Sequence, residues 1–264
     1  MQHNIPYIVG IVGSLILLAF WKVSYPYSSW AWLFPLVIHA FITFGRYEYL
    51  IRYRQCRAKC VLKESSTLFK WATRKPLVFL QALIMATTYS LPLALFSALA
   101  SIADVMFILM ASLLTRLFYP VSSRMSERHV TEAMTGIMTK QFVVRVAVLI
   151  MAVLYSVISY QFIVVPDYLD LSSLKQTMDN ASQQVASLCL TTNMLLKWAQ
   201  EFEAATWYFM ISGTQNSDMD KGNFVAWIIF FLSHTLVFAA LARLQVELIT
   251  HAMQKLTIRA TVNE

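Results

Sequence analysis

Long apolar runs separated by short polar stretches dominate the chain, and they predict helices that cross a membrane. A crossing helix needs about 20 mostly apolar residues. Backbone groups in lipid must find their hydrogen bonds within the segment, so we expect helices and not open strands. Four runs have suitable length and composition, at residues 5–21, 30–45, 142–165 and 223–242.

A fifth apolar run, residues 77–115, is too long for one crossing. Its only formally charged residue is Asp104. At 1.5 Å per residue a straight helix of this length would span about 58 Å, nearly two hydrocarbon cores. The run therefore predicts a hairpin of two helices with its turn near residues 97–104, which brings the expected number of crossings to six.

The amino-acid composition is typical of a membrane protein and not of a soluble domain. Hydrophobic residues make up 58% of the 264 positions, charged residues 13%, and the mean hydropathy is +0.57. Soluble domains carry about 25% charged residues. We predict an all-α polytopic protein that forms a single integral membrane domain over residues 1–264. The first run lacks a cationic leader and a small-residue cleavage pattern, so we interpret it as a retained helix.

The distribution of Lys and Arg orients the predicted bundle. Residues 45–75 hold nine of them and only two acids. With six crossings, 17 of the 21 Lys and Arg fall on the side of this loop, compared with 12 if residues 77–115 cross once. The positive-inside rule thus favours six helices with both termini and the loop at 46–75 in the cytoplasm. A bacterial inner membrane is the expected location, with a eukaryotic membrane as the alternative.

The basic loop predicts contacts with anionic lipid headgroups or with a partner protein. Each cation near a charged membrane surface contributes on the order of 1 kcal/mol. The cations lie between apolar runs, so membrane orientation explains them and we expect no nucleic-acid partner. The candidate contact residues are Arg46, Arg52, Arg54, Arg57, Lys59 and Lys63.

The one sizeable segment between crossings on the opposite side is 166–222. It holds seven acids and three lysines, which supports an extracytoplasmic location between helices 5 and 6. Most of it is compatible with a helix, and it is more apolar than a solvated loop requires. We expect one or two helices packed on the bundle or on a partner, with Trp198, Phe202 and Trp207 as the packing residues.

Polar groups inside crossing helices are the first candidates for function in a membrane protein. The candidates here are His39, His234, Gln161, Arg145 and Asp104. The two histidines could belong to a proton path or a ligand site. Alternatively, each could stay neutral and bond a carbonyl or hydroxyl across a helix pair. Arg145 can extend to the headgroups, and Asp104 can reach the outer interface or cap a helix.

Patterns that carry catalysis or bind cofactors are missing from the sequence. We find no nucleophile elbow, zinc-protease helix, phosphate loop or dinucleotide fingerprint. Cys56 and Cys60 lie four residues apart, but a zinc site would need two more ligands from other segments. We therefore predict no catalytic residues, no metal and no cofactor.

Three functions remain compatible with this pattern. The first is a non-enzymatic subunit of a larger membrane assembly of the secretion, transfer or defence type, which requires only adhesive surfaces. The second is a small ion channel or transporter formed by homo-oligomerisation, which requires a continuous polar path. The third is a membrane-embedded enzyme that acts on lipid, which requires a nucleophile or metal. The sequence favours the first function, with other membrane subunits or further copies of the chain as partners.

Overall fold

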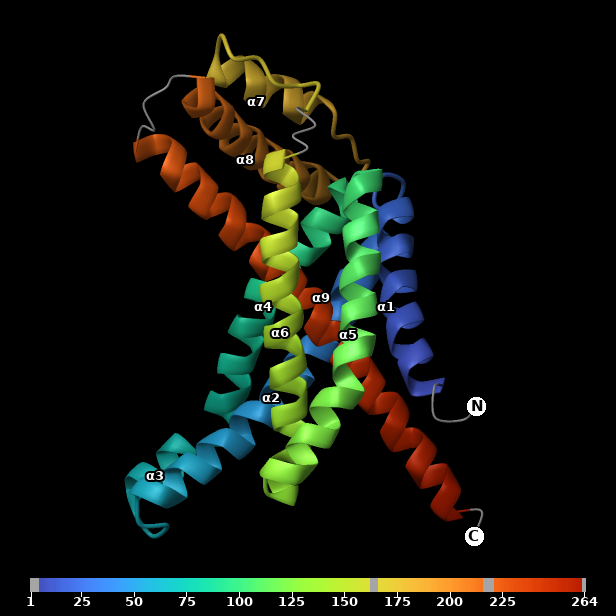
Figure 1. The fold of residues 1–264 in the computed structure, drawn as a ribbon, viewed down its shortest axis with the longest axis vertical. Helices are drawn as coiled ribbons and strands as arrows, with labels where there is room; N and C mark the ends of the chain where they lie inside the picture. Colours follow the sequence, from blue (N-terminus) through green and yellow to red (C-terminus); the bar gives the residue numbers. More distant parts are fainter. Residues whose placement is uncertain (1–4, 162–165, 216–220, 263–264) are drawn as a thin grey trace.

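The computed structural model describes residues 5–161, 166–215 and 221–262 (Figure 1). All regular secondary structure in these ranges is helical, in agreement with the predicted all-α class. The elements are α1 (Ile5–Ser24), η2 (Ser29–Trp32), α2 (Leu33–Val61), α3 (Thr67–Ala72), α4 (Lys75–Leu99), α5 (Ile102–His129), α6 (Glu132–Gln161), α7 (Leu174–Gln183), α8 (Leu190–Gln215) and α9 (Lys221–Val262).

Five helical segments are long and apolar enough to cross a membrane, which fits an integral membrane protein. They are Ile5–Ser24, Thr67–Leu99, Ile102–His129, Met134–Ser159 and Phe224–Gln254. Many of their large apolar side chains are exposed, as expected for surfaces that face lipid. The segment α2 is not among them, because its apolar first half gives way to Arg46 and Glu48.

The predicted break within residues 77–115 is confirmed. The helix α4 ends at Leu99 and α5 begins at Ile102, so the turn lies within the expected 97–104. A capping box fixes the new start: Ser101 Oγ accepts from the Asp104 amide at 3.2 Å, and Asp104 Oδ2 accepts from the Ser101 amide at 2.8 Å. This arrangement satisfies two backbone donors that a helix start leaves free.

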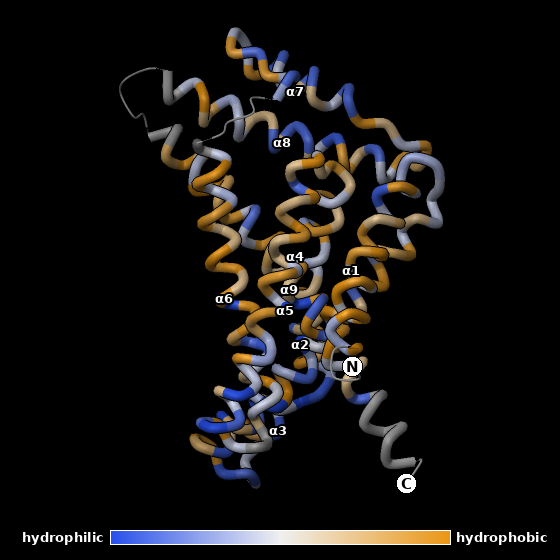
Figure 2. The backbone as a smooth tube through the Cα atoms, turned by 45° about the vertical axis from the view of Figure 1, so that its right-hand side comes forward, coloured by the Kyte–Doolittle hydropathy of each residue, from blue (hydrophilic) through white to orange (hydrophobic). Residues whose placement is uncertain are grey.

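The helix α9 forms the centre of the bundle and crosses it diagonally (Figure 1). It packs on α1, α2, α4, α5, α6 and α8. Its fully buried side chains include Phe238, Leu241, Leu244 and Ile249. Hydrophobic positions dominate the middle of the bundle, whereas hydrophilic positions gather near α3 and α7 (Figure 2). The helix α9 thus connects most elements of the bundle through its packing.

Close contact between α1 and α9 depends on a small residue. A Cβ atom on Gly10 would lie 2.8 Å from the backbone nitrogen of Ile249, closer than carbon and nitrogen can approach. Ser14, one turn later, is completely buried on the same face. Small residues allow helix backbones to approach closely in membrane proteins, where dispersion contacts replace the hydrophobic effect as the force between helices.

The predicted helical segment at 166–222 contains two helices, α7 and α8, which lie together across one end of the bundle (Figure 1). The connection between them is tied to the α1–α2 turn, because Ser187 Oγ donates to the Tyr25 carbonyl at 2.7 Å. Trp32 Nε1 also donates to Thr192 Oγ1 at 2.8 Å. We refer to this end as the upper end, and to the end that carries α3 as the lower end.

Candidate functional sites at the two ends of α9

Two groups of polar side chains, most of them partly buried, lie beside α9, one at His234 and the other at Arg243 and Glu247. The upper cluster comprises Asp104, Tyr155, Glu203, Trp207 and His234. The lower cluster comprises Arg46, Glu48, Tyr89, Lys140, Gln141, Arg243 and Glu247. Of the predicted intramembrane candidates, Asp104 and His234 belong to the upper cluster. Arg46, predicted as a lipid or partner contact, belongs to the lower cluster.

Asp104 is the anchor of the upper cluster. Its Oδ2 atom accepts the capping bonds from Ser101, and its Oδ1 atom accepts from the Tyr155 hydroxyl at 3.0 Å. The prediction that Asp104 caps a helix is therefore confirmed. The additional bond to Tyr155 connects the start of α5 to α6, and it leaves both carboxylate oxygens of Asp104 with hydrogen-bond donors.

Glu203 brings a second carboxyl group to the same place from α8. Burial, and next the negative charge of Asp104, raise the pKa of Glu203 to about 7, against a hydrogen bond with Trp207 that lowers it. A carboxylate loses hydration on burial and is repelled by a like charge, so both effects favour the protonated form. Glu203 was not a sequence candidate, because the acids of 166–222 were used only to place this segment outside the membrane.

His234 lies in an aromatic surround beneath the two carboxyl groups. Its ring stacks on Tyr155 with centroids 4.3 Å apart and contacts Phe230 and Phe96. Its Nδ1 atom lies 2.8 Å from the Phe230 carbonyl oxygen of its own helix. A carbonyl accepts only, so Nδ1 carries the proton in this contact. One predicted alternative had each histidine bond a carbonyl or hydroxyl across a helix pair. His234 does bond a carbonyl, but this carbonyl belongs to its own helix, α9.

The other predicted intramembrane candidates lie elsewhere. His39 Nδ1 lies 2.9 Å from Ser90 Oγ, which joins α2 to α4. No contact in the described part of the chain joins His39 to His234. Arg145 is exposed on α6. Gln161 ends α6, and its side chain lies outside the described residues.

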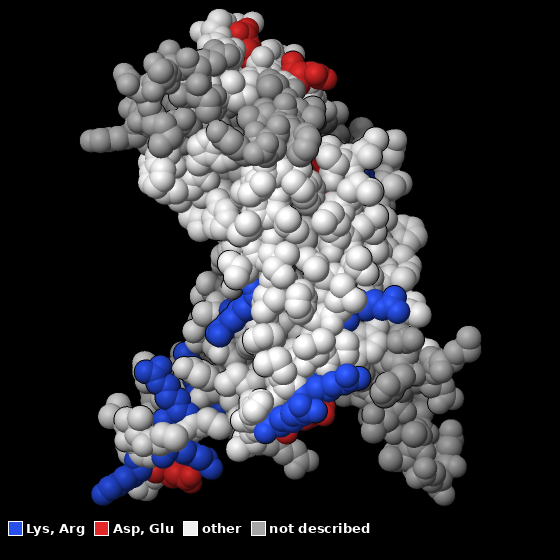
Figure 3. Space-filling model, viewed as in Figure 1, with Lys and Arg blue, Asp and Glu red and all other residues white. Residues whose placement is uncertain are grey.

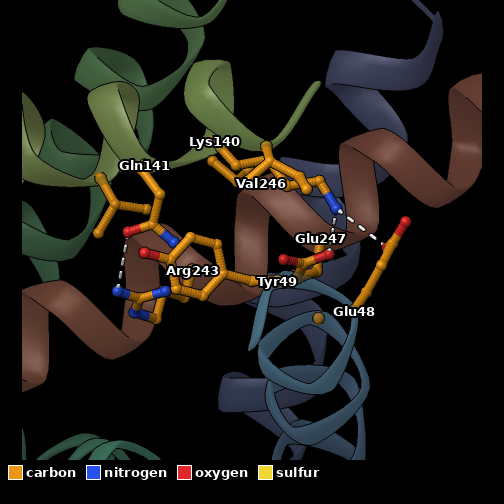
Figure 4. A pocket seen from close by; sticks show the side chains of 10 residues that line it. Glu48, Tyr49, Lys140, Gln141, Arg243, Val246 and Glu247 are labelled. Carbon is orange, nitrogen blue, oxygen red and sulfur yellow. Dashed lines mark hydrogen bonds and ion pairs between the residues drawn. The ribbon is translucent and has the colours of Figure 1, made fainter. Parts of the chain in front are cut away.

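Ion pairs fill the lower cluster (Figure 4). Lys140 Nζ on α6 lies 2.7 Å from Glu247 Oε2 on α9 and 3.9 Å from Glu48 Oε2 on α2. A Cβ atom on Gly45 would overlap the Glu247 side chain, so this glycine makes room for the acid. The space that remains among these side chains is about 10 Å³, no more than one water molecule. The ion pairs therefore join three helices, α2, α6 and α9, and leave no room for a ligand.

Two arginines share one aromatic ring beside these pairs. The guanidinium carbons of Arg46 and Arg243 lie 5.3 and 5.0 Å from the centroid of the Tyr89 ring. Arg243 also donates to Gln141 Oε1 at 3.5 Å. Cation–π attraction of this kind contributes about 0.5–2 kcal/mol and increases with desolvation. Arg46, which was predicted to contact headgroups or a partner, thus also makes a cation–π contact inside the bundle.

Level with the lower cluster but on another face of α9, Gln245 provides a further polar link that sequence reasoning missed. It is fully buried and donates to Ser112 Oγ at 2.6 Å and to Ser14 Oγ at 3.3 Å, which joins α9 to α5 and α1. Phe238, Leu241 and Leu244 separate it from His234 along the helix. The described polar groups therefore form separate layers along α9.

The remaining predicted contact residues lie on surfaces at the two ends. Arg52 pairs with Glu48 at 2.8 Å and Lys59 with Glu64 at 3.2 Å, whereas Arg57 and Lys63 are exposed. Arg54 donates to Gln81 Oε1 and to the Ala72 carbonyl. On α8, Trp207 is buried against the bundle, but Trp198 and Phe202 are exposed.

Comparison with known proteins gives no relative from which a role could be transferred: no family model, no curated protein and no solved structure matches the chain.

Proposed function

We propose that the chain is a non-enzymatic integral membrane subunit of a larger assembly of the secretion, transfer or defence type. A second apolar face on α8 carries this proposal. The helix buries Leu196, Ala204 and Met210 against the molecule. On another face of the same helix, a stripe of large apolar side chains is exposed: Leu190, Met194, Trp198, Phe202 and Phe209. We call this set the α8 stripe.

The spacing of the α8 stripe supports a protein contact. Its members recur at helical intervals, so they lie on one face of α8. Trp198 is 64% exposed and Phe202 57%, on a helix that is not among the five candidate spans. A continuous exposed apolar face rimmed by polar residues is typical of an interaction surface, and aromatic residues dominate the energy of protein interfaces.

The proposed orientation places α7 and α8 outside the cell and α3 in the cytoplasm, with α2 as a sixth crossing. Lys and Arg gather over the lower half of the molecule, whereas acids lie at the top near α7 as well as below near α3 (Figure 3). A lower end rich in cations supports a cytoplasmic location, in the inner membrane of a bacterium. Arg57 and the exposed Trp71 share a groove on this end, a combination suited to anionic headgroups.

Site-specific photocrosslinking in native membranes tests the proposed assembly. A photoreactive residue at position 198 should give a protein adduct of defined mass. Leu149 on α6 is the matched control, because its exposed fraction of 65% equals that of Trp198 while its helix is a candidate span. We expect lipid adducts at position 149. Lipid adducts alone at position 198 would mean that the α8 stripe faces the membrane interface, and the proposal would be wrong.

Transport by a homo-oligomer is the second candidate, favoured by the polar groups that α9 carries at both ends and at Gln245. In this function His39 and His234 would contribute to a path. The test is ion flux into liposomes that contain the purified chain. If flux occurs and the pair of substitutions His39→Ala and His234→Ala abolishes it, transport replaces assembly as the preferred function.

A further inference from the structure

The largest described cavity at the upper end has the size of a small-molecule site. Its volume is about 530 Å³, within the range of about 300–1,000 Å³ typical of ligand pockets. The end of α4, the start of α5, the C-terminal end of α6, the connection before α7 and the buried face of α8 line it. Its polar and aromatic lining includes Asp104, Tyr155, Tyr168, Gln200, Glu203 and Trp207.

The acids that line this cavity form no direct ion pair in the described residues, although Lys22 of α1 interacts with Asp104 at longer range. Neither Asp104 nor Glu203 forms an ion pair within the described part of the chain. Lys22 of α1 lies nearby, but its ammonium donates to the carbonyl oxygens of Ala98 at 3.1 Å and Ala100 at 2.7 Å. An acid with restricted hydration is costly unless it is paired, so Glu203, which forms no ion pair in the described residues, makes this wall suited to a positively charged ligand.

Two further polar groups in the same wall have no partner. Gln200 and Tyr168 are 8% and 7% exposed, yet Gln200 Oε1 and the Tyr168 hydroxyl are buried without a hydrogen bond. An unsatisfied buried polar atom costs about 1–3 kcal/mol. The amide oxygen can only accept, so it requires a donor. The wall therefore combines negative charge with acceptors that have no donor.

The aromatic side chains of the wall narrow the class of ligand. Tyr155 and Trp207 line the cavity together with Phe107, whose ring lies 4.7 Å from that of Tyr155. The faces of such rings attract cations. A divalent metal prefers a shell of several oxygen ligands, and the described residues contain no group of three acids, histidines or cysteines that could hold one.

We propose that the upper cavity binds a small organic cation that bears an ammonium or guanidinium group. The carboxylate of Glu203 pairs with the positive group, Gln200 Oε1 and the Tyr168 hydroxyl accept its N–H bonds, and Tyr155 and Trp207 cover its apolar part. This binding activity goes beyond a role in assembly and does not depend on it, because the cavity lies on the buried face of α8 and the α8 stripe lies on the other.

Calorimetry with the full-length chain in detergent micelles tests the proposal, with benzylammonium as the probe and benzyl alcohol as its neutral counterpart. We expect saturable binding of benzylammonium and at least tenfold weaker binding of benzyl alcohol. Glu203→Gln should weaken benzylammonium binding at least tenfold. Glu201→Gln, two residues away on the same helix, should leave it unchanged. Equal binding of both probes, or no effect of Glu203→Gln, would overturn the proposal, and so would saturable binding of Na⁺ or Ca²⁺ in place of benzylammonium.

A second variant separates ligand binding from a structural role. Tyr168→Phe removes an unpartnered hydroxyl, so it should raise the unfolding temperature by a few degrees while weakening benzylammonium binding several-fold. A residue that only supports the fold would not improve stability and lose binding together. Unchanged affinity in a stabilised Tyr168→Phe protein would remove Tyr168 from the site, and unchanged affinity in both Tyr168→Phe and Glu203→Gln would contradict the proposal.

The pH dependence of binding gives an independent readout. The titratable groups that interact with Glu203 are Asp104 from α5, Tyr155 from α6 and Tyr168 before α7, and His234 from α9 stacks on Tyr155. With a pKa of about 7, the ionised fraction of Glu203 increases about tenfold between pH 6 and pH 8, and a cation should bind more tightly by a similar factor. Affinity that is constant or falls across this range would contradict pairing with Glu203.

Discussion

The two ends of α9 use the same kinds of side chain for different purposes. At the lower end, Lys140 lies between Glu247 and Glu48, and the remaining space is about 10 Å³. At the upper end, Asp104 and Glu203 face a cavity of about 530 Å³ without a cation. Balanced charges in a filled space stabilise a fold. Acids without an ion pair beside a cavity make the fold less stable, which fits the proposed role of the upper cavity in binding a cation.

The largest expected effect comes from breaking the ion pair between Lys140 and Glu247 in the lower cluster. Lys140→Met should lower the free energy of unfolding by about 3 kcal/mol, because Glu247 would keep its charge in a partly buried position without a partner. Lys59→Met is the control, since Lys59 and Glu64 are both more than half exposed and such pairs contribute about 0–1 kcal/mol. Chemical unfolding in detergent measures both. Equal losses would show that burial does not distinguish the lower cluster from a surface pair.

A smaller effect is expected at the contact between α1 and α9, where Gly10 lies against Ile249. Gly10→Ala should cost about 2 kcal/mol, because the new Cβ forces the helices apart at Ile249. Gly13→Ala places its Cβ 4.0 Å from Leu248 Cδ1, in ordinary contact. It should be neutral or stabilise the protein by up to about 1 kcal/mol through helix propensity. The same unfolding assay compares them, and a Gly10→Ala protein as stable as Gly13→Ala would disprove the close packing.

The smallest effect concerns the pH dependence of the upper end. Because the folded protein raises the pKa of Glu203 to about 7, the folded state binds more protons than the unfolded state between pH 4.5 and 7. The contribution of Glu203 to stability should therefore fall as pH rises through this window and stay constant above it. We expect a loss on the order of 1 kcal/mol, reduced by solvent in the cavity. Glu203→Gln should remove this slope, and an unchanged slope would assign it to other groups.

The general architecture could be predicted from sequence because it depends on length and polarity alone. A run such as 77–115 with one charge cannot cross as a single helix, and Ser101 with Asp104 marks where the second helix starts. The run at 30–45 was predicted as a crossing, but α2 is not among the five candidate spans, because its helix continues through the change from apolar to basic residues at Arg46. The backbone of an α-helix can continue through such a change in polarity, whereas a membrane-spanning segment ends where the charged residues begin.

The sites could be predicted only in part, because their members meet in space and not in sequence. Lys140 and Glu247 are 107 positions apart, and each alone is typical of a solvated helix end. Glu203 was not singled out among the acids of 166–222, although one local signal was present. Gln200, Glu203 and Trp207 recur at helical spacing on one face of α8, and Trp207 at that face indicates burial. The acids that approach Glu203 could not be predicted, because they depend on how α8 packs against the bundle.

The contrast between the two ends is tested most directly by unfolding Lys140→Met and Glu203→Gln side by side at pH 8. Both substitutions remove one buried charge. We predict effects of opposite sign: Lys140→Met lowers the unfolding midpoint because it leaves Glu247 unpaired, whereas Glu203→Gln raises it because it removes an ionised group that has no cation. If both variants were destabilised to a similar extent, the upper cluster would be structural like the lower one, and the contrast between the two ends would be wrong.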